Sequence, residues 1–377
     1  MARPLRALSI FGTRPEAIKL APVLNRLKQT PAVESIVCIT AQHREMLDQV
    51  LGLFEIRPDF DLDIMQPAQP LAELSAAVFR GLEPVLTEVA PDWVLVQGDT
   101  TTVMCAALLA YYHRVKIGHV EAGLRTGDKF QPFPEEVNRQ VLGVVGDLHF
   151  APTEWARDNL LREGIPTARI VVTGNPVIDA LHEMVARPLD QSAGPLAGVD
   201  DSQQIILVTA HRRENFGDPL ERIFTALRSI ATEYAGRVTL IYPVHLNPNV
   251  QEPAHRLLTG VPNIRLIEPV DYLSMVHLMK RAYLILTDSG GIQEEAPALG
   301  KPVLVLREKT ERPEALQAGT AILVGTDPER IVGETRRLLD DPQAYSAMAK
   351  AVNPFGDGHA AERIVAALLS SHASAQP

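Results

Sequence analysis

Several kinds of residue and segment are scarce in this 377-residue sequence, and each absence argues against a class of protein. There are only two cysteines, Cys38 in a strand-like run and Cys105 in an Ala/Leu-rich helical segment, which argues for buried thiols and against disulfides or a cysteine-built metal site. No apolar run approaches the roughly 20 residues of a membrane span, and the first strand pattern leaves no room for a signal peptide. We therefore expect a cytoplasmic protein without membrane contacts.

Basic residues are too few for a nucleic-acid-binding protein. The 36 Lys and Arg residues are outnumbered by 46 Asp and Glu, which gives a formal net charge of −10 and makes general affinity for nucleic acid unexpected. Any anionic ligand must then be held by local basic residues and helix N-termini. The sequence also lacks a His-x-x-x-His motif and an aspartate-rich loop, which disfavours a metal site.

What the sequence does contain is a regular alternation of strand and helix patterns. Its 46% hydrophobic residues suffice for two cores. Strands are predicted at 5–11, 33–40, 93–96, 115–120, 147–151, 170–173, 204–209, 238–242, 264–267, 283–286 and 301–306. Such alternation in both halves predicts an α/β fold with two doubly wound parallel sheets and a ligand cleft between their strand carboxyl edges.

The predicted boundaries follow from composition. Residues 1–186 form the first domain, and the non-periodic segment 187–203, rich in Pro, Gly, Ser and Asp, is the linker. Residues 204–357 form the second domain. An amphipathic helix at about 358–372 is expected to pack back on the first domain.

A glycine turn is the most informative local pattern. The sequence Thr-Asp-Ser-Gly-Gly at 287–291 joins an apolar strand to a helix start, so that backbone N–H groups and the positive end of the helix dipole point at one spot. The residues predicted to bind a phosphate there are Ser289, Gly290 and Gly291, although Ser-Gly-Gly alone can simply turn the chain. Glu295 suits sugar or ribose hydroxyls, and Arg312 lies beside the same strand ends.

Acidic residues gather at the predicted strand ends of the first half. Asp99 follows the strand at 93–96, Glu121 follows the strand at 115–120, and Glu135 and Glu136 lie in the charged segment after it. A carboxylate cluster at strand ends is either a metal site or acid/base machinery, and we favour the second, in which crowding raises at least one pKa. For Asp99 alone, a plain helix N-cap is an equally good interpretation.

Basic residues occupy other strand ends. Arg14 and Lys19 lie at a helix start, where cations are unfavourable, which favours a functional role over that of solvated charges. His211 precedes two arginines at the end of the strand at 204–209. We predict that it contacts a phosphate or a sugar, and a structural histidine is the alternative.

Seven motifs together resemble the non-hydrolysing UDP-N-acetylglucosamine 2-epimerase family. They are GTRPEAIKLAPV at 12–23, QGDTTT at 97–102, HVEAGLRTGD at 119–128, PFPEEVNRQ at 132–140, HRREN at 211–215, LTDSGGIQEEAP at 286–297 and ERPEA at 311–315. The resemblance implies two Rossmann-like domains of the GT-B type with the active site between them, usually in a homodimer. It also implies interconversion of UDP-N-acetylglucosamine and UDP-N-acetylmannosamine for surface polysaccharides.

The resemblance further implies a mechanism without a metal or nicotinamide cofactor. UDP is eliminated across carbons 1 and 2 to give 2-acetamidoglucal, and is added back after protonation from the opposite face. The implied catalytic residues are Asp99, Glu121, Glu135 and His211, and the implied substrate-binding residues are Arg14, Lys19, Met275, Ser289, Gly290, Gly291, Glu295 and Arg312. Met275 departs from the aromatic residue that relatives place near the uracil.

Many bacterial members bind a second UDP-N-acetylglucosamine as an activator. The resemblance assigns that site to Gln42, Glu136, Arg213 and His245, but a basic residue that some members carry within 66–69 is absent here. Three rival functions are a GT-B glycosyltransferase, a 2-epimerase of a modified UDP-sugar such as a diacetamido uronate, and a non-enzymatic nucleotide-sugar sensor. The sensor would need no trio of carboxylates.

Overall fold

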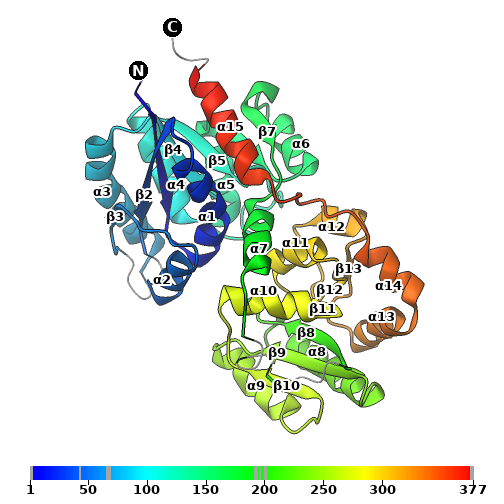
Figure 1. The fold of residues 1–377 in the computed structure, drawn as a ribbon. Helices are drawn as coiled ribbons and strands as arrows, with labels where there is room; N and C mark the ends of the chain where they lie inside the picture. The colour runs from blue at the N-terminus through cyan, green and yellow to red at the C-terminus, as the bar shows by residue number, and fades with distance from the viewer. Residues whose placement is uncertain are drawn as a thin grey trace. The chain divides into compact units, whose positions relative to one another are not determined.

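The chain folds into two compact units (Figure 1). The computed structural model describes residues 3–41, 44–64, 69–190, 194, 197–198 and 202–373. Unit 1 comprises Met1–Ala180 and Phe355–Pro377, and unit 2 comprises Leu181–Pro354. The first boundary falls inside helix α7, Pro176–Ala186. Within the described ranges, every helix is too short or too polar to cross a membrane.

Unit 1 is built on a seven-stranded parallel sheet. Its strands are β1 Leu5–Phe11, β2 Val33–Ile39, β3 Phe60–Asp61, β4 Trp93–Gln97, β5 Lys116–Val120, β6 Leu148–Ala151 and β7 Ile170–Val172. They lie in the order β3-β2-β1-β4-β5-β6-β7. All five residues of β4 are buried, because a central parallel strand is covered on both faces.

Helices cover both faces of this sheet. They are α1 Arg14–Lys28, α2 Arg44–Leu53, α3 Leu71–Val89, α4 Thr101–Tyr112, α5 Glu135–Val145, α6 Glu154–Arg162 and α15 Ala360–Ala373, with a 3-10 turn η1 at Thr167–Arg169. Helices α3 and α4 share an apolar cluster with Val94 on one face of the sheet. On the other face, a side chain at Gly118 would meet both Leu95 and Leu368, which places α15 there beside α1.

Asp179 of α7 connects the returning C-terminal segment to the rest of unit 1. Its carboxylate accepts hydrogen bonds from the first N–H groups of α15, those of Ala360 at 3.2 Å and Ala361 at 2.9 Å. A carboxylate at this end of a helix satisfies unpaired N–H groups and complements the helix dipole. The last helix is therefore held by a cap that lies about 180 residues earlier in the chain.

Unit 2 is built on a six-stranded parallel sheet in the order β10-β9-β8-β11-β12-β13. The strands are β8 Gln204–Thr209, β9 Val238–Pro243, β10 Ile264–Ile267, β11 Leu284–Thr287, β12 Val303–Val305 and β13 Ala321–Leu323. The helices are α8 Asp218–Glu233, α9 Pro248–Leu258, α10 Tyr272–Arg281, α11 Gly290–Ala298, α12 Pro313–Gln317, α13 Pro328–Asp340 and α14 Pro342–Ala349, with a 3-10 turn η3 at Arg213–Asn215. One cluster of buried side chains joins α8, α9 and α13 to the sheet.

The prediction of two doubly wound parallel sheets is confirmed. The sequence predicts neither β3 nor β13, which have two and three residues. Strands this short at the edge of a sheet carry too little periodicity to detect. Part of the predicted linker at 187–203 lies outside the described residues.

Candidate active site

Each sheet has one place where the strand order reverses. It lies between β1 and β4 in unit 1 and between β8 and β11 in unit 2. The loops after these two strands diverge, and open α/β sheets bind their ligands in the resulting crevice at the carboxyl edge. Arg14 and Asp99 follow β1 and β4, and His211 and Ser289 follow β8 and β11.

The turn between β4 and α4 presents Asp99. The helix is capped by the next residue, Thr100, whose hydroxyl accepts a hydrogen bond from the Val103 N–H at 3.3 Å. Asp99 is therefore not the cap, which removes the plain structural interpretation. Gly98 has a φ of +80°, a conformation that favours glycine, and its carbonyl accepts a hydrogen bond from the His119 ring at 2.8 Å.

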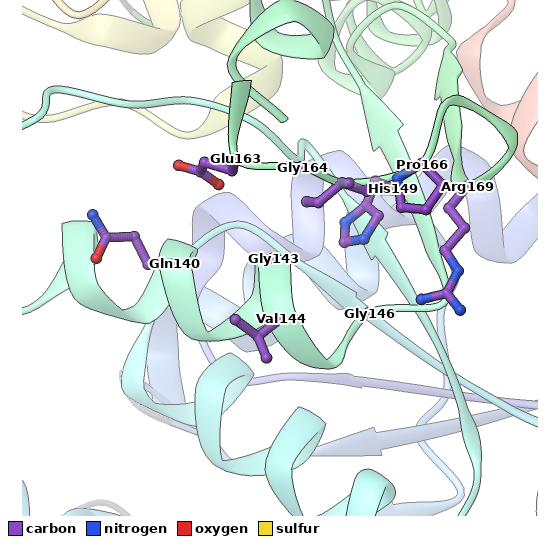
Figure 2. A pocket seen from close by; sticks show the side chains of 10 residues that line it. Gln140, Gly143, Val144, Gly146, His149, Glu163, Gly164, Pro166 and Arg169 are labelled. Atoms are coloured by element: carbon purple, nitrogen blue, oxygen red, sulfur yellow. The ribbon is translucent and has the colours of Figure 1, made fainter. Parts of the chain in front are cut away.

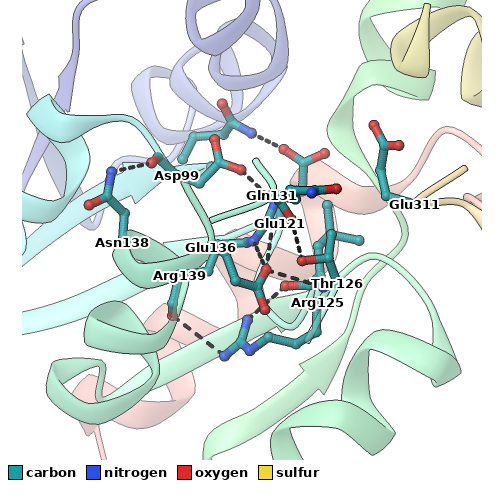
Figure 3. A network of polar contacts seen from close by, with 12 residues as sticks. Asp99, Glu121, Arg125, Thr126, Gln131, Glu136, Asn138, Arg139 and Glu311 are labelled. Atoms are coloured by element: carbon teal, nitrogen blue, oxygen red, sulfur yellow. Dashed lines mark hydrogen bonds and ion pairs between the residues drawn. The ribbon is translucent and has the colours of Figure 1, made fainter. Parts of the chain in front are cut away.

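Asp99 lies among charges of both signs. Its Oδ2 accepts a hydrogen bond from Arg139 at 2.8 Å (Figure 3). Burial raises the pKa of Asp99 to about 6, although Arg139 opposes this rise. Glu121 and Glu135 add to the rise, and Lys19 also opposes it. A carboxyl group with this pKa gains and loses a proton close to neutral pH, as a general acid or base requires.

Among the described residues, Lys19, Asn175 and Gln97 donate hydrogen bonds to Glu121, which lies directly after β5. Lys19 Nζ lies 2.5 Å from Oε1, the Asn175 amide donates to the same oxygen at 3.1 Å, and the Gln97 amide donates to Oε2. The residue is 6% exposed, and its φ of +65° lies in a region that residues other than glycine seldom adopt. These contacts fix the direction of the carboxylate and hold an unusual backbone conformation in place.

Glu135 opens α5. Its Oε2 is buried, and among the described residues it has no hydrogen-bond partner. Its charge contributes to the raised pKa of Asp99, so the two carboxyl groups interact electrostatically. A buried oxygen without a partner is costly unless a proton or ligand meets it. The structure thus brings the three predicted carboxylates, those of Asp99, Glu121 and Glu135, into one cluster.

The loop before Arg14 is tied to the Asp99 turn by a residue that the sequence analysis passed over. Glu16 accepts a hydrogen bond from the Thr13 N–H at 2.6 Å within a capping box, and another from the Thr100 hydroxyl at 2.5 Å. Glu16 is 2% exposed, and burial raises its pKa. The Thr-x-x-Glu spacing at the helix start was the available signal.

In unit 2, Asp288 organises the corresponding edge. Its Oδ2 accepts hydrogen bonds from the backbone N–H groups of His211 at 2.7 Å and Arg212 at 2.8 Å, and from the Asn215 amide at 3.1 Å. Its Oδ1 is buried, has no hydrogen bond within the described part of the chain, and lies 3.8 Å from Nδ1 of His211. From the sequence, Asp288 is recognisable only as a turn residue, although it directly follows the buried strand β11.

Helix α11 begins immediately after Ser289. In the described helix, the Ser289 hydroxyl caps none of the first N–H groups. A Cβ atom at Gly290 would lie 3.0 Å from the Arg312 guanidinium, so glycine is what allows this close approach. The first-turn N–H groups and the positive end of the helix dipole form the kind of site that binds phosphate.

Arg312, next to this helix start, forms ion pairs with two carboxylates. Its Nε and Nη2 both lie 2.7 Å from Oε1 of Glu294, and its Nη1 lies 2.8 Å from Glu311. Burial alone would raise the pKa of Glu311, but Arg312, Arg307 and Arg212 outweigh it and lower that pKa to about 2. Glu311 therefore stays ionised and holds the arginines in place.

Helix α10 supplies the neighbours of Glu295. The Tyr272 hydroxyl donates to Oε1 of Glu295 at 2.6 Å, which fixes the carboxylate near Gly291. Met275 lies on the same helix and is half-buried. Asp271 caps the helix by accepting from the Ser274 N–H at 2.7 Å.

Two predicted histidines lie together. The rings of His211 and His245 stack with centroids 5.3 Å apart and planes 17° apart. Burial lowers the pKa of His211; Asp288 opposes this effect and His245 reinforces it. Arg213 is exposed in η3. Of the other proposed activator residues, Glu136 lies in unit 1, and Gln42 is outside the described residues.

Comparison with known proteins identifies the family. A family model described as UDP-N-acetylglucosamine 2-epimerase matches residues 25–369. The chain belongs to this family. A UDP-N-acetylglucosamine 2-epimerase from Yersinia pestis is 57% identical over 370 residues, which cover 97% of this chain and 98% of the relative. The protein of the same name from Escherichia coli (strain K12) is 54% identical over 376 residues, which cover 98% and 100%.

Solved structures of the epimerase family share the fold. The crystal structure of UDP-GlcNAc 2-epimerase from Neisseria meningitidis bound to UDP-GlcNAc has a TM-score of 0.90 and 48% identity, and the match covers 97% of this chain and 100% of that one. The predicted family and the GT-B type of fold are both confirmed.

A cavity of about 220 Å³ lies elsewhere in unit 1 of this epimerase family member, between α5 and the connection from α6 to β7 (Figure 2). His149 lines it; its ring is fully buried, neither nitrogen is hydrogen-bonded within the described residues, and burial lowers its pKa to about 4. None of the described residues that line this cavity is a predicted site residue. Among the side chains that the structure describes, no group of three His, Cys, Asp or Glu is arranged to hold a metal ion.

Proposed function

We propose that this isomerase catalyses the reversible 2-epimerisation of UDP-N-acetylglucosamine to UDP-N-acetylmannosamine by elimination and re-addition of UDP. The observation that carries the proposal is the cluster of Asp99, Glu121 and Glu135 at the carboxyl edge of the unit 1 sheet. The names of highly similar relatives support the same substrate for this chain.

The chemistry requires carboxylates at the sugar. Carbon 2 has no neighbouring carbonyl group, so its proton is not acidic enough for direct removal and return. In the proposed route, one carboxylate takes the carbon 2 proton while the bond from carbon 1 to the diphosphate oxygen breaks, and UDP leaves with that electron pair. The other product is 2-acetamidoglucal. Protonation of carbon 2 from the opposite face and addition of UDP to carbon 1 give the epimer, with no net redox change.

Asp99, Glu121 and Glu135 are the proposed acid/base residues. The pKa of Asp99, about 6, suits proton transfer near neutral pH. Glu135 offers a buried oxygen that no described residue hydrogen-bonds. Glu121 is held in a fixed direction by Lys19 and two amides. We also assign substrate contacts to Lys19 and Arg14, from the start of α1.

UDP has to be stabilised as a leaving group and yet retained. We assign that task to unit 2, so that residues of both units act on one UDP-sugar. The assigned residues are Ser289, Gly290 and Gly291 for the phosphates, His211 for the diphosphate, Glu295 for the ribose, Met275 beside the uracil, and Arg312 for the substrate. The uncapped start of α11 supports the phosphate assignment.

Three further properties remain predictions for this chain. They are a homodimeric state, a cytoplasmic role in supplying mannosamine units for surface polysaccharides, and activation by a second UDP-N-acetylglucosamine at Gln42, Glu136, Arg213 and His245.

Activation is tested by initial rates with UDP-N-acetylmannosamine alone. A lag that added UDP-N-acetylglucosamine removes would support activation, and linear rates that do not respond would contradict it.

The main test is incubation with UDP-N-acetylglucosamine in deuterium oxide, followed by NMR of the sugar. We expect the manno epimer and deuterium at carbon 2, because the elimination exchanges that proton with solvent. Sugar that stays unlabelled would exclude the mechanism. Consumption of the UDP-sugar only when an acceptor is added would instead indicate a glycosyltransferase.

Asp99→Asn separates catalysis from binding. We expect turnover to fall by about 10²–10⁴-fold, as for the loss of a general acid or base, while calorimetry shows UDP binding unchanged. A wild-type protein that binds UDP-N-acetylglucosamine but neither epimerises nor labels it would point to a sensor.

A further inference from the structure

Arg139 lies outside the predicted site residues, yet it joins two of them. Its Nη1 donates to Oδ2 of Asp99 at 2.8 Å, and its Nη2 and Nε donate to Oε2 of Glu136 at 2.6 and 3.2 Å (Figure 3). Arg139 is 5% exposed and Glu136 is 0% exposed. A buried guanidinium that bridges two carboxylates has little freedom to turn, so it fixes the direction of both.

The other end of this bridge is anchored to the main chain. Oε2 of Glu136 accepts a hydrogen bond from the Thr126 N–H, and Oε1 accepts one from the Gly127 N–H, both at 3.1 Å. From the same first turns of α5, the Asn138 amide donates to the Asp99 carbonyl at 2.8 Å. Two residues of α5, Asn138 and Arg139, therefore donate hydrogen bonds to the main-chain oxygen and to a side-chain oxygen of Asp99.

We propose that Arg139 is a positioning residue for the reaction: it orients the Asp99 carboxyl group and favours its ionised form, with Glu136 as its anchor. The inference rests on the proposed function, in which Asp99 exchanges a proton with the sugar. Because Arg139 donates to Oδ2, the proposal assigns the exchanged proton to Oδ1. The fixed geometry saves the cost of orienting this group at the moment of transfer.

Other charges also act on Asp99. They come from Glu121 after β5, Glu135 on α5 and Lys19 on α1. The two carboxylates oppose ionisation of Asp99, and Lys19 favours it. Arg139 has a larger effect than Lys19, so its removal is expected to shift the titration of Asp99 to higher pH.

The test compares pH profiles of kcat/KM for the wild type, Arg139→Lys and the double variant Arg139→Gln/Glu136→Gln. The double variant avoids leaving Glu136 as a buried carboxylate without its cation. In the pH profile, the limb set by Asp99 is the part where kcat/KM changes as Asp99 gains or loses its proton, near pH 6 in the wild type. We expect this limb to move up by about 1–3 pH units in the double variant. The direction is the same whether Asp99 acts as acid or base.

Arg139→Lys keeps the charge but loses the two-pronged geometry, so kcat falls at least about tenfold while the limb stays within about one pH unit.

Glu163→Gln is the matched control. It removes a carboxylate that Arg125 holds through two nitrogens at 2.7 Å, in the same unit but in a pair that does not include Asp99. We expect its profile to match that of the wild type. Thermal unfolding and UDP binding report whether each variant is folded.

Two outcomes overturn the inference. One is an unmoved limb in a folded double variant, and the other is wild-type kcat in Arg139→Lys, which decides the question even if the double variant does not fold. Failure of the proposed function looks different, because the wild type itself would then neither epimerise nor label its substrate.

Discussion

At the residue scale, the pKa of a carboxyl group shifts in opposite directions in the two units, although burial favours the protonated form in both. Burial raises the pKa of Asp99 to about 6, because nearby cations are offset by neighbouring carboxylates. Around Glu311, three arginines outweigh burial and lower the pKa to about 2. The first group is suited to moving protons and the second to holding a structure in place. Neighbouring charges, and not residue type, separate the two roles.

Gly290→Ala tests the phosphate site at this scale. The new Cβ would lie 3.0 Å from the Arg312 guanidinium, so the arginine or the start of α11 has to move. We expect UDP affinity, measured by calorimetry, to fall at least about tenfold, which corresponds to about 1.4 kcal/mol. Gly333→Ala in α13 is the control, since in the described structure nothing lies within 4 Å of that position. It should leave affinity unchanged and raise stability by about 0.5–1 kcal/mol. Wild-type affinity in Gly290→Ala would contradict the assignment.

His149 makes unit 1 sensitive to acid. Burial lowers its pKa to about 4, so below pH 6.5 the unfolded chain binds a proton that the folded chain does not. The contribution of His149 to the free energy of unfolding is therefore constant above pH 6.5 and falls by about 1.4 kcal/mol per pH unit between about pH 6 and pH 4. We expect His149→Leu to reduce the change in the free energy of unfolding with pH, measured by urea unfolding at a series of pH values. An equal slope in wild type and His149→Leu would refute the prediction.

At the element scale, α15 depends on its cap. Asp179→Ala removes the acceptor for the N–H groups of Ala360 and Ala361, at a cost of about 1 kcal/mol. We expect faster hydrogen exchange in the first turns of α15. Asp327→Ala removes the corresponding cap of α13, where Asp327 accepts from the Glu329 N–H at 3.2 Å, and serves as the matched control. It should speed exchange in α13 alone, so equal effects of both variants on α15 would argue against a local cap.

At the scale of the whole molecule, the proposal gives the two units different parts of one ligand. In hydrogen exchange with Asp99→Asn, which prevents turnover, we expect UDP to protect amides near 209–217 and 287–295 in unit 2. UDP-N-acetylglucosamine should in addition protect 97–102 and 119–127 in unit 1, because only this ligand carries the sugar. Protection confined to unit 2 with both ligands would contradict a shared substrate.

Several features of the site depend on partners that are distant in sequence. Asp288 and the His211 N–H that it accepts are 77 residues apart, and Arg139 and Asp99 are 40 apart. Nothing in the local pattern around these residues marks the pairing, so neither Arg139 nor the role of Asp288 could be predicted from the sequence. The short strands β3 and β13 were not predicted for another reason. A segment of two or three residues is too short to show a hydrophobic period.

The sequence by itself determined the α/β class, the two parallel sheets and the family, because strand–helix alternation and loop motifs are written along the chain. It also indicated which carboxylates lie at strand ends. Only the tertiary structure decided the chemical state of those residues. The pKa of Asp99, the pairing of Lys19 with Glu121 across 102 residues and the φ of +65° at Glu121 all arise from burial and from charges that folding brings together. Burial and distance between charges are properties of the packed chain, and periodicity cannot encode them.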